Sequence, residues 1–131
     1  MPPWAPSPAR LPALAAAADA TAVVVFAASG RAFHDSGADL LGFLGTLAPF
    51  ALGLFVAWAA PSVRAHPTRL RSGVVVLVGT AVIGLALRAA FTGRLPLSFA
   101  LVAVVTLAVL LLGWRGIAAL VARALARPPV P

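Results

Sequence analysis

Four long apolar runs dominate the sequence and limit what the chain can fold into. They cover about residues 11–29, 40–60, 72–91 and 97–120. Each run is close to the ~20 residues that a helix needs to cross the hydrocarbon core of a bilayer. A segment in lipid must satisfy its own backbone hydrogen bonds, which leaves helices or closed barrels. Barrel strands alternate apolar and polar residues, whereas these runs are continuously apolar. The sequence therefore predicts an all-α fold, a four-helix transmembrane bundle.

The composition agrees with a membrane protein. Of the 131 residues, 62% are hydrophobic and 10% are charged, and the mean hydropathy is +1.04. A soluble domain carries about 25% charged residues. The chain has no Cys, which excludes disulfides and thiolate chemistry. The formal net charge is +7, but the arginines flank the apolar runs and form no single basic face, so we expect no nucleic-acid partner.

A single transmembrane domain is expected between two Pro-rich tails. The domain would cover residues 11–122, with tails at residues 1–10 and 123–131. A secretory signal peptide is the alternative interpretation of the first run, because the small residues Ala27–Ser29 would suit a cleavage site. Asp19 would interrupt the apolar region of such a peptide, so a retained span is the favoured interpretation.

The distribution of arginine predicts the orientation of the bundle. With four spans, both tails and the middle loop share one side of the membrane. Seven arginines belong to that side: Arg10, Arg64, Arg69, Arg71, Arg115, Arg123 and Arg127. Arg31 and Arg94 belong to the other side, with Arg88 near it inside the third run. The positive-inside rule therefore predicts a multi-pass protein of the cell inner (plasma) membrane, with its N- and C-termini in the cytoplasm.

Asp19 and Arg88 are charged residues inside the apolar runs. Asp19 lies eight residues after the start of the first run, a depth of roughly 12 Å at 1.5 Å per residue. A lone ion at mid-bilayer costs at least ~2.5–3.5 kcal/mol, and such residues often mark functional sites. Because a helical side chain leans toward its own N-terminus, Arg88 would lean toward the level of Asp19. We interpret the two as an intramembrane pair that either lines a polar pocket or ion path or has a structural role. Two separate interfacial residues are the alternative, which a helix start near Ala15 would favour.

Small residues, a proline and two tryptophans mark the expected packing and anchoring positions. Gly53 shares one helical face with Pro49, and Gly84 lies on the small-residue face of the third run. Small residues let helices approach closely in lipid, so packing within the bundle is the favoured interpretation. Pro49 also predicts a kink in the second run. Trp58 and Trp114 come near the ends of their runs and are interpreted as anchors at the membrane interface.

Arginines also gather near the outer side, where the positive-inside rule predicts few. Arg31, Arg88 and Arg94 form this group, and His34 lies in the adjoining loop. Together they predict a pocket for an anionic group, either a lipid headgroup or an anionic solute. The alternative is that these arginines snorkel and form salt bridges to the two loop aspartates.

Enzymatic signatures are weak in this sequence. Residues 34–39 hold one His and two Asp, which is fewer and less well spaced than a zinc site requires. Ser29 or Ser36 near His34 supplies residue types of a hydrolase triad without a nucleophile elbow. We therefore expect no metal, no cofactor and no enzymatic activity.

The motifs together resemble those of a known family. A D-x6-F-x3-G-R-x2-H pattern begins at Asp19, and the further motifs are Pro49-Phe50, Gly53, Trp58, Gly73, Gly84, Leu87-Arg88, Phe91–Arg94, Ser98-Phe99 and Gly113–Arg115. The combination is similar to the domain of unknown function 3054 family, small four-span membrane proteins of actinobacteria and some archaea, over about residues 16–117. The family has no established activity. The resemblance therefore implies a fold and a topology, and it implies that five charged positions are characteristic: Asp19, Arg31, His34, Arg88 and Arg94.

The sequence leaves two functions open. The first is a transporter-like or permease-like unit in which Asp19 is the protonatable group and Arg88 its partner. The second is a non-catalytic structural, lipid-binding or accessory subunit of a membrane complex. The bilayer is the partner that the composition requires. Anionic lipid, a second copy of the chain or another membrane protein are the further candidates.

Overall fold

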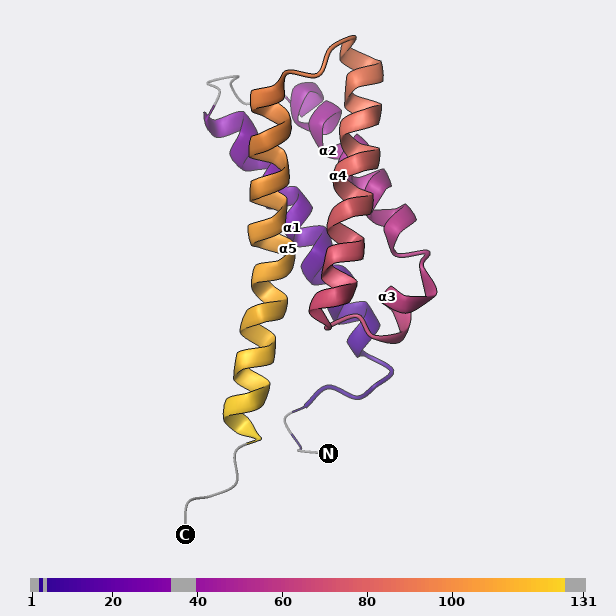
Figure 1. The fold of residues 1–131 in the computed structure, drawn as a ribbon, viewed down its shortest axis with the longest axis vertical. Coiled ribbons are helices and arrows are strands. Elements are labelled where there is room, and N and C mark those ends of the chain that lie inside the picture. Colours follow the sequence, from indigo (N-terminus) through magenta and orange to yellow (C-terminus); the bar gives the residue numbers. More distant parts are fainter. Residues whose placement is uncertain (1–2, 4, 34–39, 127–131) are drawn as a thin grey trace.

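The computed structural model describes residues 3, 5–33 and 40–126, and it is built of helices packed side by side (Figure 1). Four of them are long and apolar enough to cross a membrane: α1 (Leu11–Phe33), α2 (Leu40–Ala57), α4 (Leu70–Thr92) and α5 (Leu97–Leu125). The short helix α3 (Pro61–Ala65) lies between α2 and α4 in the chain. The predicted all-α four-helix bundle is confirmed, and its apolar helices are compatible with a membrane protein.

The four long helices form a ring in which each has two neighbours. Helix α2 packs against α4, α4 against α5, α5 against α1, and α1 against α2. The start of α1, the short helix α3 and the end of α5 lie at one end of the bundle, which we call the termini end (Figure 1). The connection between α4 and α5, residues 93–96, lies at the opposite end, which we call the hairpin end.

Local signals explain where several helices begin and end. Gly93 ends α4 in the left-handed conformation, with φ of 77°, which a residue without Cβ adopts at little cost. After α2, the amides of Ala59 and Ala60 bond to carbonyls three residues back, at 3.0 and 3.1 Å. This tightened turn leads into α3, where Pro61 occupies a first-turn position. Pro61 therefore starts a helix as well as following one.

The expected packing residues lie at the contact between α2 and α4. Pro49 and Gly53 are buried in α2, which continues as helix past the proline, and Gly84 is buried in α4. A Cβ added to Gly53 would lie 2.9 Å from the backbone oxygen of Thr80. A Cβ on Gly84 would collide with the ring of Phe50. The two helices therefore approach closely because glycine stands at these positions.

Candidate functional site

Asp19 lies fully buried at the termini end of the bundle, with 0% of its surface exposed. Arg115 of α5 donates from Nη1 to Oδ1 and from Nη2 to Oδ2, both at 2.8 Å, which makes a two-bond ion pair. The indole N–H of Trp114 donates to Oδ1 at 2.8 Å, and that of Trp58 donates to Oδ2 at 3.0 Å. Each carboxylate oxygen thus accepts two hydrogen bonds, which compensates the loss of water around a buried charge.

The guanidinium of Arg115 is equally enclosed, with 0% exposure. Its Nε donates to the backbone oxygen of Pro67 at 3.0 Å, and its Nη1 also donates to that of Leu111 at 2.9 Å. Its central carbon lies 4.4 Å from the centroid of the Trp114 ring, within the range of a cation–π contact. Because Pro67 belongs to the connection between α3 and α4, Arg115 joins that connection to α1 and α5.

A glycine on α4 makes room for this arginine. A Cβ on Gly73 would lie 2.7 Å from Cδ of Arg115 and 2.8 Å from Cδ2 of Leu112. The preceding residue, Ser72, is buried and donates its hydroxyl to the backbone oxygen of His66 at 2.6 Å. The resulting group, which we call the Asp19 cluster, consists of five residues drawn from α1, α4, α5 and the turn after α2: Asp19, Trp58, Gly73, Trp114 and Arg115.

The sequence pointed to Arg88 as the partner of Asp19, and that pairing is wrong. Arg88 donates from Nη1 to Oγ1 of Thr46 on α2 at 3.1 Å, and its central carbon lies 4.6 Å from the Phe99 ring centroid. The helical rise explains the separation. Asp19 is eight residues from the start of α1, roughly 12 Å, whereas Arg88 is eighteen residues from the start of α4, roughly 27 Å. Both helices start at the termini end, and the difference in level exceeds what one arginine side chain spans.

Sequence reasoning missed the roles of three residues in the cluster. Arg115 was counted with the flanking cytoplasmic arginines, although it falls inside the run predicted at residues 97–120. That position was the signal, since a charge inside a span requires a partner. Trp58 and Trp114 were interpreted as interface anchors, but the N–H of each indole donates to Asp19. The alternative helix start near Ala15 is also wrong, because α1 begins at Leu11.

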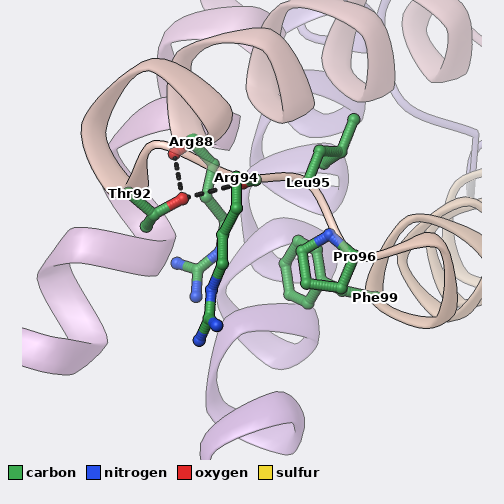
Figure 2. Close-up of a pocket in the computed structure, with 6 residues that line it drawn as sticks. All are labelled: Arg88, Thr92, Arg94, Leu95, Pro96 and Phe99. Atoms are coloured by element: carbon green, nitrogen blue, oxygen red, sulfur yellow. Dashed lines mark hydrogen bonds between the residues drawn. The ribbon is translucent and has the colours of Figure 1, made fainter.

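A second polar site lies at the hairpin end, in a pocket of about 450 Å³. The side chains of Arg88 and Arg94 run alongside each other and extend in the same direction (Figure 2). The lining is completed by Thr92, Leu95, Pro96 and Phe99. The hydroxyl of Thr92 lies 2.9 Å from the backbone oxygens of both arginines, so it fixes the end of α4 to the turn that follows.

The predicted outer-side group is thus placed in part. The structure brings Arg88 and Arg94 to one pocket. Arg31 belongs to α1, but its side chain is outside the described part of the structure, and His34 lies outside the described residues. In the parts of the chain that are described, no group of three or more His, Cys, Asp or Glu side chains comes together as a metal site would require.

Comparison with known proteins identifies the family of this chain. A family model described as "Protein of unknown function (DUF3054)" matches residues 16–118. The chain belongs to the DUF3054 family. The match includes the Asp19 cluster and the residues that line the arginine pocket, so both sites are part of the DUF3054 region. No curated protein and no solved structure matches the chain.

Proposed function

We propose that this DUF3054 protein is a non-catalytic membrane protein that binds a phosphate-type anion in the pocket lined by Arg88 and Arg94. The observation that carries the proposal is the parallel placement of two arginine side chains in one pocket (Figure 2). Guanidinium groups match the geometry of phosphate oxygens and can bind them through paired hydrogen bonds. The proposal is the lipid-binding form of the second function that the sequence left open.

The chemistry of Arg94 supports this assignment. Arg94 is exposed, and among the described residues its guanidinium makes no hydrogen bond or ion pair. It follows the end of α4 and precedes the first turn of α5, whose N-terminus carries partial positive charge. An anion in the pocket would therefore face a free guanidinium and the favourable end of a helix.

The level of the pocket suits a phosphate at a membrane surface. Arg88 is four residues before the end of α4, roughly 6 Å along the helix axis. Helix α4 has 23 residues, about 35 Å of length, against a hydrocarbon core of about 30 Å. Arg88 and Arg94 would then lie near the headgroups, with Phe99 and Leu95 as apolar neighbours. The phosphate could come from a lipid headgroup or from a soluble anion.

The transporter-like alternative receives less support from the contacts. It requires Asp19 to accept and release a proton, yet each oxygen of Asp19 already accepts two N–H hydrogen bonds. Its proposed partner, Arg88, lies at the other end of the bundle. The geometry of the Asp19 cluster favours a structural role.

Local protection from a thiol reagent tests the proposal. The chain has no Cys, so Leu95→Cys places a single thiol in the pocket lining. Phe91→Cys is the matched control, since Phe91 is exposed at the same end of the bundle but outside the lining. Inorganic phosphate and short-chain phosphatidylglycerol are the probes. We expect one of them to slow labelling of Leu95→Cys and to leave Phe91→Cys unchanged.

The two probes distinguish the sources of the phosphate. Protection by inorganic phosphate identifies a soluble anion, and protection by phosphatidylglycerol alone identifies a lipid headgroup. Adding Arg94→Gln to Leu95→Cys should remove the protection. Equal labelling rates with and without both probes would show that the pocket binds no phosphate group.

A further inference from the structure

A larger and mostly apolar groove of about 710 Å³ lies at the termini end. It runs between the first turns of α1 and the second half of α5, and the start of α4 closes one side. Leu11 and Leu14 of α1 form one wall, while Trp114 and Ala118 of α5 form another. Leu14 is 52% exposed, so the groove opens on the surface that faces lipid in a spanning bundle. Such a groove suits a hydrocarbon chain.

The described lining of the groove includes one charged side chain. Of the described residues that line it, Arg69 alone is ionic. Arg69 immediately precedes α4 and is exposed. In the described part of the chain its guanidinium has no acidic partner. The groove therefore combines long apolar walls with a single cation at one edge.

The surroundings of the groove are positively charged as well. Three further exposed arginines flank the helix ends at this side of the bundle: Arg10 before α1, Arg71 in the first turn of α4 and Arg123 in the last turn of α5. The acidic side chain described at this end, Asp19, is already neutralised by Arg115. The termini end is thus complementary to an anionic lipid and unfavourable for a cationic ligand.

We propose that this groove holds an anionic phospholipid, with an acyl chain between α1 and α5 and the phosphate at Arg69. The site is independent of the arginine pocket, since it lies at the opposite end of the bundle and would face the opposite leaflet. A chain in the groove would cover apolar surface of Leu11, Leu14 and Trp114. Arg69 would supply the preference for anionic headgroups.

Native mass spectrometry of the full chain in detergent tests this assignment. Phosphatidylglycerol and phosphatidylcholine are the probes, and we expect wild type to retain phosphatidylglycerol preferentially. Arg69→Gln should lower its affinity about fivefold, the effect of one arginine near an anionic headgroup. Arg71→Gln is the matched control, because Arg71 is exposed two residues away and lies outside the groove lining. We expect it to bind as wild type does.

A second variant tests the apolar part of the site. Ala118→Phe places a ring in the groove while Arg69 remains, and it should also reduce retention of phosphatidylglycerol. Equal losses in Arg69→Gln and Arg71→Gln would mean that binding follows net charge, which overturns the proposal. Wild-type binding by Ala118→Phe would overturn it too, as would a lipid-free dimer in place of the lipid complex. Arg69→Gln should lower retention of phosphatidylglycerol by the same factor in an Arg94→Gln background, where the arginine pocket no longer contributes, and this separates its outcome from that of the arginine pocket.

Discussion

Among single residues, we expect Asp19 and Arg115, which form an ion pair, to contribute most to the stability of the bundle. Both side chains have 0% exposure. Every hydrogen bond within the Asp19 cluster has Asp19 as its acceptor, and Arg115 donates two of the four. Removing one partner leaves the other charge buried without compensation, which is more costly than removing both. The residues should therefore act as a unit.

Single substitutions at this pair are expected to destabilise the bundle strongly. Asp19→Asn or Arg115→Gln alone should lower the free energy of unfolding by about 3–5 kcal/mol, whereas the double variant should lose less than the sum. Unfolding by denaturing detergent measures this. The control is Asp19→Asn with Arg88→Gln, whose effects should add to within about 0.5 kcal/mol, because the two residues share no contact. Additive losses for Asp19 and Arg115 would contradict the pairing.

The partner of Asp19 was harder to predict from the sequence than the importance of Asp19 itself. The depth of Asp19 in an apolar run marked it as a site, and that much followed from hydropathy. The choice of Arg88 as partner rested on the lean of a side chain along one helix. The actual partner depends on the order of helices around the ring and on their relative levels. Neither is encoded in the hydropathy of a single run, so Arg115 was misread although it lay inside one.

The helices themselves followed more directly from the sequence. All four long helices overlap the predicted runs. The ends differ by several residues: α1 continues to Phe33 and α5 to Leu125, because backbone hydrogen bonding extends beyond the apolar stretch. Helix α3 was missed, since five residues give no hydropathy period.

The contact between α2 and α4 gives a prediction at this scale. Gly53→Ala would put a Cβ 2.9 Å from the backbone oxygen of Thr80, and backbone cannot move aside without shifting a helix. We expect a loss of about 1–3 kcal/mol in unfolding free energy. Gly45→Ala is the control on the same helix, where a Cβ meets nothing within 4 Å. It should be neutral or stabilising by up to about 1 kcal/mol. Equal stability of the two variants would argue against the close approach.

At the scale of the whole molecule, the two ends of the bundle carry different sites. The termini end holds the Asp19 cluster and the lipid groove, and the hairpin end holds the arginine pocket. The even number of long helices puts the start of α1 and the end of α5 at the same side (Figure 1). With most arginines at that side, we expect it to face the cytoplasm.

Labelling of introduced cysteines in cells tests this topology. Ser7→Cys and Ala126→Cys report on the two tails, and Leu95→Cys reports on the hairpin end. A membrane-impermeant thiol reagent should label Leu95→Cys in intact cells. It should reach Ser7→Cys and Ala126→Cys only after permeabilisation. Labelling of one tail but not the other in intact cells would exclude the four-span arrangement. Labelling of both tails but not of Leu95→Cys would exclude the predicted orientation.

The ion pair also has a consequence for synthesis, because its partners are 96 residues apart in the chain. At about 5–20 residues per second, Asp19 leaves the ribosome roughly 5–20 s before Arg115 does. During that interval the first span carries a carboxylate whose final partner does not yet exist. Helix α5, which is synthesised last, therefore supplies the partner of the acidic residue in α1, which is synthesised first. A nascent chain that stops before residue 115 keeps a lone acidic group in its first span, and this distinguishes it chemically from a finished one.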